Sequence, residues 1–203
     1  APKGADRFLA RLPQLLESQR ELLPERLRRV LLAFWAEVEA LEEHMRAVEK
    51  ELAEIVRAHP VMRALLEIPG IGVLTATALY VSVGNIHLFP NGRHLASWLG
   101  ITPKEHSSGN TRWLGRINKE GDPYLRTLLI HGARAAMTAA QTRQRAGKPL
   151  SRLQQWAVEK AASLRHSNPA VVALANKLAR ICWAVWRHER SFDGNYRSLP
   201  AAA

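Results

Sequence analysis

The sequence predicts an all-α protein, in which a long coiled-coil-like helix precedes a helical domain that contains a helix-hairpin-helix. Apolar residues recur at helical spacing along most of the chain, and no region is rich in the alternating pattern of strands. Prolines that suit a first helical turn and glycines that end helices divide the rest of the chain into shorter helices. Because it has 203 residues, 47% of them hydrophobic, the chain is long enough to bury a core.

The expected first domain, residues 1–58, is a helical linker and coiled coil. A short amphipathic helix is expected over residues 7–20, and a long helix over about residues 25–56. The long segment has apolar residues at alternating spacings of four and three, the a/d pattern of a coiled coil. These residues are Leu27, Leu31, Phe34, Val38, Leu41, Met45, Val48, Leu52 and Ile55. The length of the pattern favours a homo-oligomer, and packing on neighbouring helices of the same chain is the alternative.

A helix-hairpin-helix is expected at about residues 60–84, at the start of a second domain that covers residues 59–190. Two short helices are joined there by the run PGIG, which contains Gly70 and Gly72. Glycines let a phosphate approach the backbone closely, and the amides that open the second helix can bind it. A plain helical corner is the alternative, because Pro-Gly turns are common.

Further helices are expected in the second domain, interrupted by one long polar segment. This Gly-rich segment covers about residues 101–121, and a loop of that length inside a compact domain is usually functional. Asp122 and Pro123 suit the cap and the first turn of the helix that follows it. The helices are expected at residues 94–99, 122–144, 150–164 and 168–188. A loose tail is expected at residues 191–203.

The chain is strongly basic, with 29 Lys and Arg against 18 Asp and Glu and a formal net charge of +11. Residues 93–152 hold eleven of the basic residues and only three of the acidic ones, so most of the excess charge lies in this stretch. A nucleic acid is therefore the first partner to consider. A solvated basic face is the alternative.

Composition also argues against several other classes of protein. Cys182 is the single cysteine, which excludes a disulfide framework and a cysteine-based zinc site and fits a reducing cytosol. The chain opens without the apolar core of a secretory signal, and its longest apolar stretches are interrupted by Lys or Arg. We therefore expect no membrane association.

The serines of the polar segment suggest phosphodiester chemistry. Ser107 and Ser108 precede a glycine and lie among the basic residues His106, Arg112, Arg116, Lys119 and Arg126. Cations favour a serine alkoxide, bind the phosphodiester that it attacks and stabilise the charge that develops on phosphorus. The alternative, which the residues alone favour, is a polar surface loop whose serines only cap turns. The sequence has no Gly-x-Ser-x-Gly elbow, no metal-ligand spacing of histidines and no acidic cluster for a two-metal nuclease.

Several runs, in order, resemble the C-terminal domain of one insertion-sequence transposase family, called IS-one-ten, and in particular its IS-one-one-one-one branch. The runs are LEIPGIG at 66–72, LASWLGITP at 95–103, HSSG at 106–109, GRINKEGD at 115–122, YLRTLLIHGARA at 124–135 and ALANKLAR at 173–180. The heptad helix resembles the linker that precedes this domain in the family. The resemblance covers about residues 60–190.

The resemblance implies a mechanism. Proteins of the family join a RuvC-like domain, which carries four metal-binding acids (the DEDD set), to a coiled coil and a serine-bearing domain. They are DNA recombinases that a structured RNA from the element guides to donor and target DNA. The serine beside glycine is their nucleophile and corresponds to Ser108, with Ser107 as the second choice. Magnesium held by the acids completes a composite active site.

The sequence departs from the family in two ways. Asn110 and Asn118 stand where relatives commonly carry glycine and serine. The DEDD acids cannot be assigned to any residue, so magnesium is expected in a missing RuvC-like domain and no cofactor in this chain. The abrupt start, at Pro2-Lys3-Gly4, looks like the middle of a longer protein.

The function expected from these observations is that of a transposase domain which binds DNA and a guide RNA and is inactive by itself. It supplies the serine in the full-length protein, in the bacterial cytoplasm and at the nucleoid. The expected nucleic-acid-binding residues are Gly70, Gly72, Arg112, Arg116, Lys119 and Arg126. The alternative function is a non-catalytic helix-hairpin-helix module that binds nucleic acid and dimerises. A purely structural coiled-coil adaptor is disfavoured by the concentrated basic charge.

Overall fold

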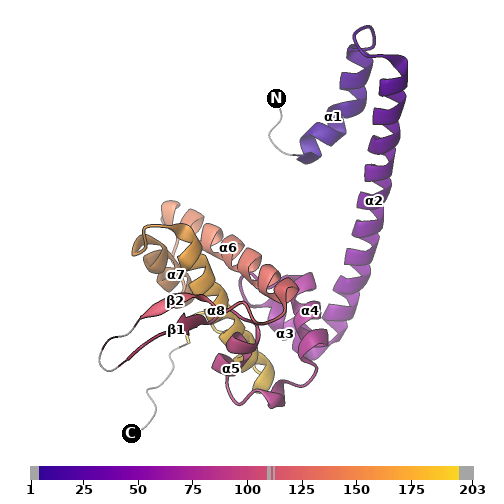
Figure 1. Ribbon diagram of the computed structural model, residues 1–203. Coiled ribbons are helices and arrows are strands. Elements are labelled where there is room, and N and C mark those ends of the chain that lie inside the picture. Colours follow the sequence, from indigo (N-terminus) through magenta and orange to yellow (C-terminus); the bar gives the residue numbers. More distant parts are fainter. Residues whose placement is uncertain (1–4, 109–110, 112, 197–203) are drawn as a thin grey trace. The chain divides into compact units, whose positions relative to one another are not determined.

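The computed structural model describes residues 5–108, 111 and 113–196, and the described part is mostly helical (Figure 1). The prediction of a mostly α-helical protein is confirmed. The chain divides into two compact units, residues 1–51 and residues 52–203. Each unit is described by itself below.

The first unit is an antiparallel pair of helices, α1 (Ala5–Ser18) and the larger part of α2 (Glu25–Ala58). The Trp35 indole Nε1 donates a hydrogen bond to the Leu9 carbonyl oxygen at 3.0 Å, which holds the two helices together. The long helix is where the heptad pattern predicts it. Much of its apolar stripe faces solvent within the single chain, with exposed fractions of 44% to 62%. The exposed members are Leu27, Phe34, Leu41, Met45, Val48 and Ile55.

The boundary between the units lies inside α2, a few residues before the expected position at 58. Val56 is fully buried, so the last turns of α2 belong to the second unit. The second unit continues with α3 (Pro60–Leu66), α4 (Val73–Val83), a 3-10 turn η1 (Ile86–Leu88) and α5 (Gly92–Trp98), then β1 (Pro103–Glu105) and β2 (Leu114–Ile117), and ends with α6 (Pro123–Arg145), α7 (Arg152–Ala162) and α8 (Ser167–Arg187).

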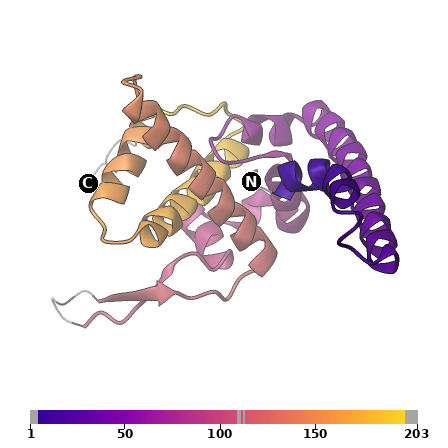
Figure 2. The same ribbon diagram turned by 90° about the horizontal axis from the view of Figure 1, so that it is seen from above.

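Helix α8 forms the centre of the core of the second unit. It packs against α3, α5, α6 and α7, which lie around it in Figures 1 and 2. Its buried residues are Ala170, Val171, Leu174, Ala175, Leu178, Ala179, Cys182, Val185 and Trp186. Burial raises the pKa of the Cys182 thiol to about 12, so this cysteine is a packing residue and not a reactive one.

Residues 101–121 differ from the expected loop, because β1 and β2 pair as an antiparallel hairpin. The hairpin extends away from the helices in Figure 2. Its two ends are brought together by glycines, since a Cβ on Gly100 would lie 2.7 Å from the amide nitrogen of Gly121. Gly100 also adopts φ +69°, which favours glycine. The described part of the polar segment therefore projects from a narrow base.

The expected loose tail is also corrected for residues 191–196. The Gly194 carbonyl accepts a hydrogen bond from the Leu153 amide at 3.0 Å, and the Asn195 side chain accepts one from the Arg152 amide at 3.0 Å. Phe192 packs against the core. These contacts tie the segment to the start of α7. Residues 197–203 lie outside the described residues.

Candidate nucleic-acid interface

The hairpin carries both candidate nucleophiles, and their hydroxyl groups differ in hydrogen bonding. The Ser107 hydroxyl donates a hydrogen bond to Glu105 Oε1 at 2.7 Å and accepts one from the Trp113 amide at 3.3 Å. Ser108 pairs with Thr111 through its backbone only. Within the described part of the hairpin, the Ser108 hydroxyl has no hydrogen-bond partner. Both serines are exposed, so Ser107 helps to hold the hairpin together while the Ser108 hydroxyl is available to a ligand.

The predicted basic residues fall into two groups. Arg116 lies on β2 and Lys119 follows it, and both are exposed and line the same cleft. Arg126 instead has a structural partner, because its Nη1 donates to the Gly121 carbonyl at 3.1 Å and so supports the base of the hairpin. Arg112 lies outside the described residues.

The two glycines of the predicted helix-hairpin-helix also have different surroundings. Gly70 adopts φ +88° and its backbone packs against that of Gly132 in α6, so that a Cβ on Gly70 would lie 2.7 Å from the Gly132 carbonyl carbon. Gly72 caps α4, is exposed and has no atom within 4 Å of the position of a Cβ. Both helices are present where they are expected. Of the two glycines, Gly72 is the one that a phosphate could approach, and the helix-hairpin-helix stays a prediction.

A large cleft gathers basic residues that the sequence patterns do not single out. It has a volume of about 1930 Å³ and is lined by the start of α5, the base of the hairpin, α7, α8 and residues 190–196. Its basic residues are Arg93, Arg116, Lys119, Arg152, Lys160, Lys177, Arg180 and Arg190. Of the predicted site residues that the structure describes, Arg116 and Lys119 line it. The Lys177–Arg180 spacing of three on one helix is a local signal for these two residues, whereas the other cations are brought to the cleft only by the fold.

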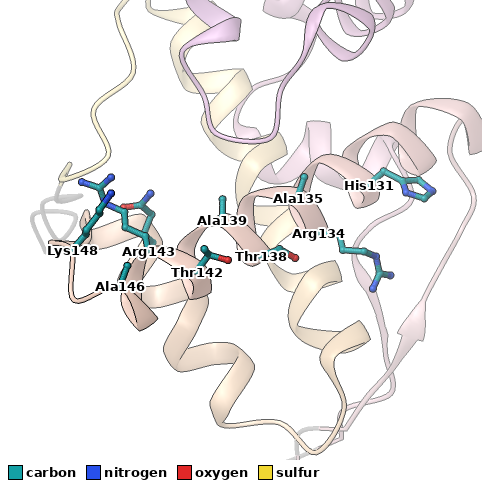
Figure 3. A pocket seen from close by; sticks show the side chains of 10 residues that line it. His131, Arg134, Ala135, Thr138, Ala139, Thr142, Arg143, Ala146 and Lys148 are labelled. Atoms are coloured by element: carbon teal, nitrogen blue, oxygen red, sulfur yellow. The ribbon is translucent and has the colours of Figure 1, made fainter. Parts of the chain in front are cut away.

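A second basic surface follows one side of α6, and the helix has no acidic residue along its length. Figure 3 shows Arg134, Thr138 and Thr142 along this side, with Arg143 and Lys148 near the end of the helix. Two of these cations have structural partners. Arg134 Nη2 donates to Asn168 Oδ1 at 3.2 Å, and Arg143 Nε donates to the Pro149 carbonyl at 2.7 Å. The surface is therefore less free to bind a ligand than the cleft.

The described residues do not provide a metal centre. No group of three or more His, Cys, Asp or Glu among them is placed to hold a metal ion. A search of the same residues finds no helix long and apolar enough to cross a membrane.

Comparison with known proteins shows that the chain is similar to insertion-sequence transposases. Residues 62–148 match the family model described as the transposase IS116/IS110/IS902 family. The chain is 37% identical over 190 residues to the transposase for insertion sequence element IS1111A of Coxiella burnetii, an alignment that covers 94% of this chain and 50% of that protein. Over residues 62–148 the chain is thus similar to the IS116/IS110/IS902 family of insertion-sequence transposases.

Two further relatives are consistent with this similarity. A probable family 20 transposase of Pseudomonas aeruginosa is 36% identical over 190 residues, which cover 94% of this chain and 54% of that protein. A pilin gene-inverting protein of Moraxella bovis is 25% identical over 198 residues, which cover 92% of this chain and 59% of that protein. The chain thus spans about half the length of the curated relatives that it matches.

Proposed function

We propose that this chain is the serine-bearing domain of a DNA recombinase and that Ser108 is its nucleophile. The observation that carries the proposal is the exposed Ser108 hydroxyl, which no hydrogen bond in the described hairpin occupies, on a projection with Arg116 and Lys119 at its base. Similarity to a transposase family supports DNA as the substrate.

In the proposed reaction, Ser108 Oγ attacks the phosphorus of a DNA phosphodiester. A bond forms between the serine oxygen and phosphorus, the bond from phosphorus to one sugar oxygen breaks, and that sugar oxygen leaves with the electron pair. The serine proton passes to a base that lies outside the described hairpin. The phosphoserine–DNA link keeps the energy of the broken bond, so a second sugar hydroxyl can reverse the step on another strand. Basic side chains near the phosphate stabilise the charge that develops on it.

The proposal gives the remaining parts of the reaction to the rest of the full-length protein. The DEDD acids and the magnesium that the family resemblance implies are assigned there, because no group of three or more His, Cys, Asp or Glu among the described residues could hold a metal ion. A structured RNA encoded by the element is the proposed guide, and a second copy of the chain is proposed to pair through the exposed stripe of α2. This chain alone is accordingly expected to bind DNA or RNA without exchanging strands.

The test uses the full-length protein with its guide RNA, donor DNA and target DNA. Ser108→Ala should lower strand exchange by at least about a thousandfold and remove the protein–DNA adduct seen on denaturing gels, while DNA and RNA affinity stay nearly unchanged. Ser107→Ala is the matched control. It removes the hydrogen bonds to Glu105 and Trp113, worth about 1 kcal/mol each, and should leave the adduct detectable.

The outcomes separate the alternatives. If both single variants exchange strands, neither serine is the nucleophile, and the chain is then better described as a non-catalytic binding module. If only Ser107→Ala is inactive, the hairpin is the catalytic element but the nucleophile is shifted by one residue.

A further inference from the structure

The cleft between α8, α7 and the base of the hairpin concentrates positive charge far beyond the average of the chain. Eight Lys and Arg line it, and Asp193 is the one acidic residue among its lining residues. In the described part of the chain, none of these cations lies within 4.0 Å of a carboxylate oxygen. The ion pairs found there all lie within α1, α2 and the turn between them. The cleft therefore has a large positive potential that the described protein does not neutralise.

Lys177 is the cleft cation on which burial and the neighbouring charges act together. Desolvation by burial, and then the charges of Arg180 and Arg152, lower the pKa of the Lys177 ammonium group. Its Nζ lies 4.3 Å from the centre of the Trp156 ring, which orients the ammonium group over an aromatic face. Holding like charges together in a half-buried place costs folding free energy, and an anion in the cleft would offset that cost.

The apolar side chains of the cleft indicate which polyanion it fits. Trp156, Val172 and Ile181 line it together with the cations, and each is partly exposed although Trp156 and Ile181 also pack against the core. A DNA duplex presents phosphates on its outside and keeps its bases stacked within, so it would leave this apolar surface uncovered. A single strand offers both phosphates for the cations and exposed bases for aromatic and aliphatic side chains.

We propose that this cleft binds a single strand of nucleic acid, with phosphates on Arg152, Lys177 and Arg180 and a base against Trp156. The strand would pass the base of the hairpin, because Arg116 and Lys119 line the same cleft. This proposal deepens the proposed function. It depends on that function in one respect, namely that the chain binds nucleic acid. Binding in the cleft does not need Ser108.

The experiment measures fluorescence anisotropy of the chain with three labelled probes of one mixed sequence, each about twelve nucleotides long, the length that a groove of this kind covers. The probes are single-stranded DNA, single-stranded RNA and a DNA duplex. The variant Lys177→Gln/Arg180→Gln removes two cleft charges. Arg165→Gln/Arg187→Gln removes two exposed charges that do not line the cleft and serves as the matched control.

The cleft variant should bind the single strands at least about tenfold more weakly, and its log–log salt slope should fall by about 0.7 for each lost contact. The control should change affinity less than about twofold. Lys177→Arg keeps the charge and should restore most of the binding, which excludes a folding defect. A loss confined to DNA or to RNA supports the proposal and identifies the strand. Unchanged binding of both strands overturns it, and so does an equal loss on the duplex.

The same experiment separates this proposal from the proposed function. Ser108→Ala should bind all three probes like the unaltered chain. If the cleft variant loses the strands while full-length Ser108→Ala still forms an adduct, the cleft proposal stands and the nucleophile is wrong. If the adduct depends on Ser108 but the cleft variant binds the single strands normally, Ser108 is the nucleophile and the cleft proposal is wrong.

Discussion

Replacing Gly132 by alanine tests whether the α3–α4 turn is built on a close glycine–glycine contact. Gly132 lies in the interior of α6, where alanine ordinarily stabilises a helix by about 1 kcal/mol relative to glycine. A Cβ at this position would lie 3.0 Å from the carbonyl carbon of Gly70 and closer still to its oxygen. Because carbon atoms pack best at about 3.5–4.0 Å, the turn and α6 would have to separate by roughly 1 Å.

That separation would loosen Ile68 and Ile71, which flank the turn and are 1% and 4% exposed. Overpacking of this kind costs about 1–3 kcal/mol, and the upper end applies because the contacting atoms belong to backbone. After subtraction of the helix-propensity gain, we expect Gly132→Ala to destabilise the protein by about 2 kcal/mol. For a unit of this size that lowers the midpoint of thermal unfolding by about 4–8 °C.

The assay is thermal unfolding followed by circular dichroism at 222 nm, the wavelength of the helical signal. Gly72→Ala is the control, because a Cβ there meets nothing within 4 Å and only the helix cap is changed. It should cost less than about 1 kcal/mol and should weaken duplex binding if a phosphate approaches α4. An unfolding midpoint for Gly132→Ala at or above that of the unaltered chain would refute the packing argument.

Three further predictions concern other parts of the chain. Glutamate at Leu41 or Met45, which are exposed on α2, should dissociate an oligomer in light scattering without unfolding the second unit; a monomeric unaltered chain would contradict this. Arg116→Gln and Lys119→Gln should each lower the slope of log affinity for duplex DNA against log salt concentration by about 0.9. An unchanged slope would count against phosphate contacts. Burial raises the pKa of the Cys182 thiol from 9.0 to about 12. The buried neutral thiol therefore contributes fully to folding stability below pH 9.0, and this contribution is lost as the pH rises toward 12. Thiol reagents near neutral pH should modify Cys182 only after the protein unfolds.

The helices could be predicted because their signals are local. The heptad of α2 lies within one continuous segment, and Asp122 caps α6 as expected, since its side chain accepts hydrogen bonds from the Tyr124 amide at 2.7 Å and the Leu125 amide at 3.2 Å. The hairpin could not be predicted in the same way. Its strands have three and four residues, include Pro103 and Gly115, and lack the alternation that identifies longer strands.

The packing of Gly70 and the basic cleft depend on residues that are distant in the sequence. The local pattern gives Gly70 a plausible role in phosphate binding, but its neighbour is Gly132, which only the tertiary fold brings next to it. Likewise, the sequence of α8 shows the apolar face of a core helix. It does not show that Lys177 and Arg180 line the same cleft as Arg152 of α7 and Arg116 of the hairpin. The net charge predicts a polyanionic partner, whereas the place where that partner binds depends on the fold.

The hairpin places the two candidate serines in different surroundings. Side chains two residues apart on extended backbone share a face, and the hydrogen bond from Ser107 to Glu105 has this geometry. Ser108 is therefore directed to the opposite face, where its hydroxyl is not used by the described hairpin. A nucleophile at Ser107 would have to break its contacts with Glu105 and Trp113 before it could reach a phosphate, whereas one at Ser108 would leave the hairpin intact. The assignment of Ser108 thus rests on which face of the hairpin meets DNA, and strand exchange by the two alanine variants measures that directly.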